Sequence, residues 1–157
     1  MSEVSVGQQA PDFTLHDVFG QDQVTLSEHR GQPVVLMFVP LAFSGVCTEE
    51  LCHVGENWDV WGGLGARIYG ISIDSPFVNQ KWKSDMGVPF PILSDFNKTA
   101  AEAYGVLERD FFGLRGVAKR SVFVVDGEGS VGFAWVSDDP GVLPPFAEIV
   151  DAVRKVS

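Results

Sequence analysis

The segment Val34-Val-Leu-Met-Phe-Val-Pro-Leu-Ala-Phe-Ser-Gly-Val-Cys47 decides the fold. Its first six residues are all apolar and stand between Pro33 and Pro40, which is typical of a strand buried on both faces of a sheet. A loop follows, and then a helix that we expect from Ser44 to Trp61, where Gly62-Gly63 ends it. A doubly buried strand that leads into a helix favours a layered α/β domain.

The rest of the chain continues the alternation of strands and helices. We expect a short strand at 13–15, a helical turn at 27–31, a strand at 67–73, helices at 76–86 and 97–104, strands at 121–125 and 131–136, and a helix at 144–155. Asp126-Gly-Glu-Gly129 between the last two strands is a hairpin signal. This order predicts one α/β domain over residues 1–157, with helices on both faces of a mixed central sheet, and a thioredoxin-like sheet is one of several compatible topologies.

Composition excludes several classes of partner. The chain has 21 acidic and 11 basic residues and a net charge of -10, and no run of Lys and Arg offsets it. Nucleic acid and anionic membrane surfaces are therefore poor partners. The longest apolar run is six residues, against the ~20 that a membrane span needs, and residues 1–6 lack the features of a secretory signal. We therefore expect a cytoplasmic protein.

Cys47 is the first candidate for chemistry, because it falls in the first turn of the expected helix. Unpaired N–H groups and the helix dipole favour an anion there, so a thiol at this position should ionise more easily. At 100° per residue, the core-facing side of the helix carries Cys47 together with Leu51, Val54, Trp58 and Trp61. From these facts alone, a nucleophilic thiolate and a small buried core side chain both remain open.

The motif Pro40-x-x-x-Ser44-x-x-Cys47 resembles the active-site motif Pro-x-x-x-Thr/Ser-x-x-Cys of the peroxiredoxin family. Segments 7–15, 70–75, 91–95, 103–106 and 120–127 resemble that family in the same order, and segment 38–47 is most similar to its alkyl hydroperoxide reductase E (AhpE) type. The resemblance implies a thioredoxin-like fold. It also implies a thiol-dependent peroxidase that reduces hydrogen peroxide and organic hydroperoxides.

The resemblance further implies a role for each matching residue. Cys47 would be the peroxidatic cysteine that becomes a sulfenic acid, and Ser44 would hydrogen-bond the peroxide. Pro40 would shield the sulfur from water, Arg120 would place a cation beside it, and Glu50 would orient that arginine. Plain structural alternatives are a strand terminator for Pro40, a solvated strand end for Arg120 and a charge that complements the helix dipole for Glu50.

Cys52 departs from the AhpE type. It resembles the resolving cysteine of the bacterioferritin-comigratory (PrxQ) branch, which has the same Cys-x4-Cys spacing. On an intact helix the two Cα atoms would lie roughly 8–9 Å apart, beyond the about 7 Å that a disulfide spans, so a Cys47–Cys52 disulfide requires the helix to unwind. The alternatives are a one-cysteine mechanism with Cys52 as a bystander, and a non-enzymatic redox sensor. A Cys-x-x-Cys disulfide oxidoreductase is disfavoured by the spacing.

No cofactor and no metal are expected. Cys47, Cys52 and His53 do not supply the four ligands of a tetrahedral site. The segment Gly127-Glu-Gly-Ser-Val-Gly132 matches a dinucleotide fingerprint but precedes a strand rather than a helix. The resemblance implies a thioredoxin-like or small-thiol reductant and a homodimer, and the aromatic segment 111–114 is a candidate interface.

Overall fold

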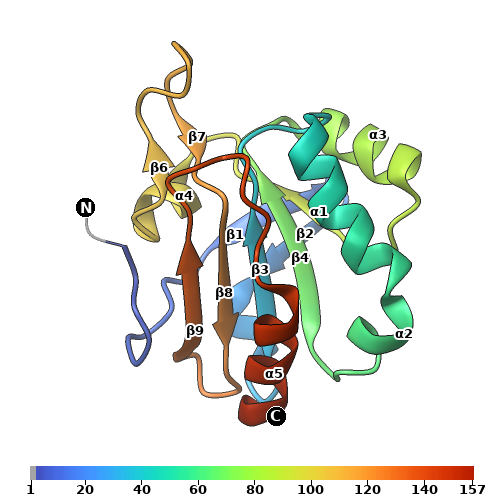
Figure 1. Ribbon diagram of the computed structural model, residues 1–157, viewed down its shortest axis with the longest axis vertical. Helices are drawn as coiled ribbons and strands as arrows, with labels where there is room; N and C mark the ends of the chain where they lie inside the picture. The colour runs from blue at the N-terminus through green and yellow to red at the C-terminus, as the bar shows by residue number, and fades with distance from the viewer. Residues whose placement is uncertain (1–2) are drawn as a thin grey trace.

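A seven-stranded mixed sheet forms the centre of the protein, as the computed structural model of residues 3–157 shows (Figure 1). Its strand order is β2-β1-β5-β4-β3-β8-β9, with β3, β4 and β5 parallel to one another and the other pairs antiparallel. The strands are β1 (Thr14–Val18), β2 (Asp22–Thr25), β3 (Val34–Phe38), β4 (Arg67–Ser72), β5 (Ile92–Ser94), β8 (Ser121–Val125) and β9 (Val131–Val136). A separate ladder pairs β6 (Leu107–Glu108) with β7 (Val117–Ala118).

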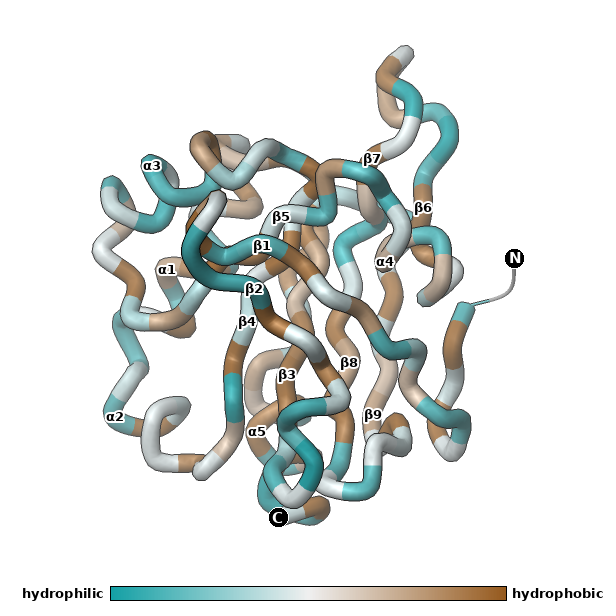
Figure 2. Tube along the Cα trace, turned by 180° about the vertical axis from the view of Figure 1, so that it is seen from behind, coloured by the Kyte–Doolittle hydropathy of each residue, from teal (hydrophilic) through white to brown (hydrophobic). Residues whose placement is uncertain are grey.

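Helices cover both faces of this sheet, as the sequence predicts. They are α1 (Gly45–Glu56), α2 (Trp58–Trp61), α3 (Pro76–Met86), α4 (Thr99–Ala103) and α5 (Phe146–Val156), with a 3-10 turn η1 (Leu26–His29). Figure 1 shows α1, α3 and α5 in front of the sheet, and Figure 2 shows α4 from the opposite side. None of the helices in residues 3–157 has the length and apolarity to cross a membrane.

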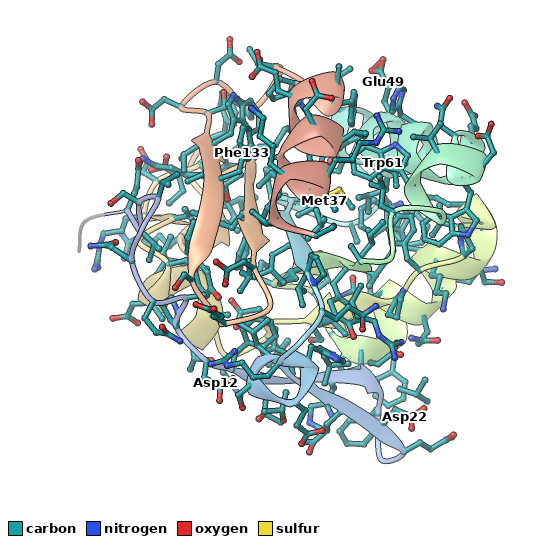
Figure 3. The ribbon with its side chains drawn as sticks, turned by 90° about the horizontal axis from the view of Figure 1, so that it is seen from below. Asp12, Asp22, Met37, Glu49, Trp61 and Phe133 are labelled. Carbon is teal, nitrogen blue, oxygen red and sulfur yellow. The ribbon has the colours of Figure 1, made fainter. Side chains whose placement is uncertain are left out.

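The hydrophobic core consists of two clusters of buried side chains, and strand β3 contributes to both. Leu36 and Phe38 pack with the α4 side, whereas Val35 and Met37 pack with α1, α3 and α5. Figure 3 shows Met37 close to α5 among the buried side chains. A strand covered on both faces has no polar side to alternate with, which explains its uniformly apolar sequence.

The helix expected from Ser44 to Trp61 is two helices, and the prediction of one continuous helix was wrong. Asn57 separates α1 from α2, and its side-chain Nδ2 donates to the carbonyl oxygen of His53 at 2.7 Å. An asparagine that bonds the backbone in this way competes with helix continuation. The predicted apolar face is otherwise confirmed, because Leu51, Val54 and Trp61 are buried.

Other boundaries also differ from the prediction. The helix expected at 97–104 covers only Thr99–Ala103, because Lys98 has a left-handed φ of 64° and the Asp95 carboxylate accepts the N–H groups of Ala100 and Ala101. Strands β2, β5, β6 and β7 were not predicted. They have only two to four residues each, too few to show a period.

Strand register sets the position of the site. Phe38, the last residue of β3, pairs with Ile71 near the end of parallel β4 and with Ser121, the first residue of antiparallel β8. The loop after β3, the loop after β4 and the residues just before β8 therefore meet at one edge of the sheet. Ligands tend to bind outside the carboxyl ends of strands in such sheets.

Candidate active site

Cys47 is the third residue of α1 and is fully buried. Ser44, the residue just before α1, has extended backbone angles, and its side chain does not cap the helix. The first turn of α1 contains no acidic residue. The positive end of the helix dipole is thus not neutralised by a side chain of that turn. The Cys47 side chain therefore lies near the positive end of α1.

Arg120 reaches the sulfur from the opposite side, 73 residues along the chain. It stands just before β8, and its Nη2 lies 3.4 Å from Sγ of Cys47. Its Nη1 donates to Oε1 of Glu50 at 2.9 Å, and its Nε and Nη2 both donate to the carbonyl oxygen of Pro140. The planar guanidinium is therefore fixed at every nitrogen while one N–H is directed at the sulfur.

The Glu50–Arg120 pair is buried, with side chains that are 0% and 2% exposed. Burial raises the pKa of Glu50 to about 7, against the opposing effects of the Arg120 charge and hydrogen bond. Burial also disfavours the charge of Arg120, but the anionic neighbours Cys47 and Glu50 outweigh it and raise the pKa of the guanidinium. Oε2 of Glu50 is buried and has no hydrogen-bond partner among the described residues.

A cavity of about 270 Å³ opens in front of this cluster. Its lining includes Pro40, Ser44, Val46, Phe111 and Arg120, and is mainly apolar. The Ser44 hydroxyl donates to the carbonyl oxygen of Leu41 at 3.0 Å, which leaves its lone pairs free to accept a hydrogen bond. The structure thus brings the predicted residues Pro40, Ser44, Cys47, Glu50 and Arg120 together at one place.

Comparison with known proteins supports what this geometry indicates. The model of the family described as "AhpC/TSA family" matches residues 6–134. The chain belongs to this family. It is 38% identical to alkyl hydroperoxide reductase E of Mycobacterium tuberculosis over 134 residues, covering 83% of this chain and 84% of the relative. It is 37% identical to a putative peroxiredoxin of Synechocystis over 148 residues, covering 88% and 72%.

Solved structures agree with the sequence relatives. Peroxidoxin BcpB of Mycobacterium tuberculosis superposes with a TM-score of 0.83 at 28% identity, covering 97% of each chain. The predicted thioredoxin-like fold and the predicted peroxiredoxin family are confirmed. The protein is therefore an enzyme, a thiol-dependent peroxidase.

The second cysteine of this peroxiredoxin lies in a different environment. Cys52 is half-buried on α1, and both cysteines are free thiols. Partial burial and the Glu56 carboxylate both raise the pKa of the Cys52 thiol. The structure therefore holds Cys52 mainly as a neutral thiol, apart from the Arg120 cluster.

Two contributors to the site were missed by sequence reasoning. The carbonyl oxygen of Pro140 accepts two of the Arg120 hydrogen bonds, and any residue could supply that oxygen, so no sequence signal existed. Phe111 lines the cavity, whereas the sequence indicated an interface for the whole segment 111–114. Of the three large apolar side chains in that segment, Phe112 and Leu114 are exposed, at 85% and 50%, and Phe111 is half-buried. Within residues 3–157 no group of three or more His, Cys, Asp or Glu could hold a metal ion.

Proposed function

We propose that Cys47 is the peroxidatic cysteine of this enzyme. Its thiolate attacks one oxygen of a hydroperoxide, the O–O bond breaks, and the released hydroxide or alkoxide takes up a proton to become water or alcohol. Cys47 is left as a sulfenic acid, oxidised by two electrons. The observation that carries this proposal is the 3.4 Å contact between Arg120 Nη2 and the buried Cys47 sulfur, with the same guanidinium anchored on Glu50 and Pro140.

The surrounding residues would divide the remaining work. Arg120 stabilises the negative charge that spreads over the sulfur and the reacting oxygens. The lone pairs of Ser44 accept the O–H of the hydroperoxide and hold it in line with the sulfur. Pro40 covers one side of the cavity and excludes water, and Glu50 keeps the guanidinium turned towards Cys47.

Both hydrogen peroxide and organic hydroperoxides are the proposed substrates. The apolar lining from Val46 and Phe111 gives an alkyl group a surface to bury, and the cavity of about 270 Å³ exceeds the needs of hydrogen peroxide. A comparison of hydrogen peroxide with tert-butyl and cumene hydroperoxide tests this assignment. We expect Phe111→Ala to weaken the reaction with cumene hydroperoxide more than the reaction with hydrogen peroxide.

Cys52 is the proposed resolving cysteine. Its thiol attacks the sulfenic sulfur of Cys47, the S–O bond breaks, and water leaves as the disulfide forms. Intact helix geometry separates the two Cα atoms by roughly 8–9 Å, so the first turns of α1 must unwind before the sulfurs meet. In the reduced fold, burial and, second, the Glu56 carboxylate raise the pKa of the Cys52 thiol, and an unwinding that extends to Cys52 removes both effects.

Mass spectrometry after one equivalent of hydrogen peroxide tests this step. A Cys47–Cys52 disulfide lowers the mass of the monomer by two hydrogens and protects both thiols from alkylation. A lasting gain of one oxygen on Cys47, with Cys52 still alkylated, would instead establish the one-cysteine mechanism. Cys52→Ser is the matched control, because it allows only the second outcome.

We further propose that a thioredoxin-like protein or a small thiol reduces the disulfide, and that the enzyme acts in the cytoplasm as a homodimer. The exposed Phe112 and Leu114, close to the cavity residue Phe111, support an interface beside the site. Analytical ultracentrifugation of the wild type and of Phe112→Ser tests the dimer. We expect a dimer for the wild type and a shift towards monomer for the variant.

A further inference from the structure

The loop between β3 and α1 contains a strained residue. Phe43 has a φ of 66°, in the left-handed region that bulky side chains rarely adopt. Such residues persist only where neighbouring contacts hold them. After Phe43, the Ser44 hydroxyl donates to Leu41, and before it, the N–H of Ala42 donates to Oδ2 of Asp74 at 2.7 Å. Asp74 is therefore the side chain from another element that holds this loop by a charged hydrogen bond.

Asp74 is itself held by hydrogen bonds to residues of β4 and β5. It follows β4, and its backbone N–H donates to Oγ of Ser72 at 3.2 Å. The one hydroxyl proton of Ser72 faces two acceptors, Oδ2 of Asp74 at 3.0 Å and Oδ1 of Asn79 at 2.8 Å. Its carbonyl oxygen accepts from Oγ of Ser94 in β5 at 2.6 Å. The buried Asn79 of α3 lies 2.8 Å from Oγ of Ser72 and completes the network. The oxygen that receives the Ala42 N–H thus belongs to a half-buried side chain that is hydrogen-bonded to Ser72, the last residue of β4.

Ser44 is the residue that this contact would control. The turn from Leu41 to Ser44 is short, so its conformation depends on where the Ala42 N–H is held. The ring of Phe43 packs on Trp82 with centroids 6.2 Å apart, which is a second contact on the same turn. Loss of the Asp74 contact would leave the left-handed Phe43 to relax, and this would rotate the Ser44 hydroxyl away from the cavity.

We propose that Asp74 is a positioning residue for the peroxidase reaction, which it serves by holding the Ala42 N–H so that Ser44 presents its lone pairs to the hydroperoxide. This inference rests on the proposed role of Ser44 as a hydrogen-bond acceptor for the substrate. Asp74 does not line the cavity, and among the described residues its side chain is hydrogen-bonded to Ala42 and Ser72, so it would act through the loop.

A double-mutant cycle on oxidation of Cys47 by hydrogen peroxide tests the proposal. We expect Asp74→Ala to lower the second-order rate about tenfold, because small misplacements of a positioning group have effects of this order. In a Ser44→Ala background the same change should have less than a twofold effect. Alkylation of Cys47 by neutral iodoacetamide does not need Ser44 and should change less than twofold. Asp74→Asn keeps a carbonyl oxygen for Ala42 and should restore most of the rate.

Ser75→Ala is the control for stability. Ser75, the neighbour of Asp74, caps α3 by accepting a hydrogen bond from the N–H of Val78, and among the described residues its side chain forms no hydrogen bond with residues 41–44. Its loss should therefore weaken the start of α3 without moving Ser44. A wild-type rate for Ser75→Ala supports the proposal. A tenfold loss in Asp74→Ala that persists in the Ser44→Ala background, or a wild-type rate for Asp74→Ala, overturns it while leaving the role of Ser44 intact. A wild-type rate for Ser44→Ala itself refutes the proposed role of Ser44 and this inference with it.

Discussion

Cys47 and Cys52 lie five residues apart on the same helix, and their surroundings differ in every respect that matters for thiol chemistry. Cys47 is fully buried near the start of α1 and contacts the Arg120 guanidinium. Cys52 is half-buried in the middle of the helix, and its partial burial, together with Glu56 one turn later, raises the pKa of its thiol. A sulfur at the helix start beside a cation is suited to a thiolate, and a sulfur beside a carboxylate is not.

Each thiol also has a carboxylate of α1 near it, Glu50 for Cys47 and Glu56 for Cys52, and the two carboxylates differ in what they bind. Glu50 is buried and forms an ion pair with Arg120, whose Nη2 lies 3.4 Å from the Cys47 sulfur. Glu56 is exposed, and its effect on Cys52 is repulsive. The comparison teaches that a carboxylate near a thiol supports or opposes reactivity according to whether it first binds a cation.

The largest expected effect concerns Cys47 itself. Cys47→Ser should abolish peroxide consumption, because no other thiol of the chain contacts Arg120. Cys52→Ser should still consume one equivalent of peroxide at the wild-type rate, because Cys52 enters only after the first oxidation. Rapid-mixing assays of peroxide loss measure both, and circular dichroism checks that each variant is folded. Wild-type turnover by Cys47→Ser would show that Cys47 is not required for the reaction with peroxide, and the contrast drawn between the two thiols would be wrong.

The next effect concerns the cation that distinguishes the two thiols. Arg120→Met should slow the oxidation of Cys47 about 100-fold, since removal of one preorganised donor commonly has an effect of this size. Arg120→Lys should recover only part of the rate, because an ammonium cannot reach Glu50, Pro140 and the sulfur together. Stopped-flow oxidation under pseudo-first-order conditions measures the rate.

Two controls separate charge from fold in this experiment. Arg154→Met removes one positive charge from α5 and should leave the rate unchanged. The double variant Arg120→Met with Glu50→Gln avoids a buried unpaired carboxylate, so its rate is free of that source of destabilisation. Equal rates in the wild type and both Arg120 variants would remove Arg120 from the reaction.

Much of this site could be predicted from the sequence because its residues are fixed by local pattern. The apolar run 34–39 indicates the buried strand β3, and the start of the following helix places Cys47 near its positive end. The proximity of Arg120 to Cys47 depends instead on the antiparallel register of β8 against β3. From the sequence, only the resemblance to a family predicted that Arg120 lies beside Cys47.

The features that could not be predicted depend on backbone atoms and on single side chains. The Pro140 carbonyl that holds Arg120 leaves no trace in the sequence. The break at Asn57 depends on one side chain bonding His53, within a run that otherwise has helical periodicity. The prediction of a helix from Ser44 to Trp61 assumed that this periodicity continues, whereas Trp58–Trp61 form the separate helix α2 beyond the break.

A third prediction uses Glu50 to test whether the buried carboxylate on the Cys47 side titrates near neutrality. Its pKa is about 7 in the folded protein, against an ordinary value of 4.5. Between these pH values the folded state binds more protons than the unfolded state, so the free energy of unfolding falls as pH rises. The fall amounts to about 3 kcal/mol, at about 1.4 kcal/mol per pKa unit. Glu50→Gln cannot titrate and should lack this fall.

Urea unfolding at pH 5 and pH 8 measures the effect as the difference between the two variants. The wild type should lose more stability than Glu50→Gln over this interval, and Glu49→Gln, which changes an exposed carboxylate of the same helix, should behave as the wild type. Parallel pH dependence in the wild type and Glu50→Gln would mean that Glu50 titrates normally. Burial would then have no effect on the titration of Glu50.

The smallest expected effect concerns Glu56 and Cys52. In a Cys47→Ser background, Glu56→Gln should speed alkylation of Cys52 at pH 8 by about two- to threefold, because an exposed charge one turn away acts through solvent. High salt should reduce the difference, since exposed charges are screened. Asp59→Asn, beyond the helix break, should have no effect.

In the protein with Cys47 intact, Glu56→Gln should leave the rate of disulfide formation unchanged, because the proposed unwinding of α1 has by then separated Cys52 from Glu56. Faster disulfide formation in that variant would show that Cys52 attacks from the intact helix.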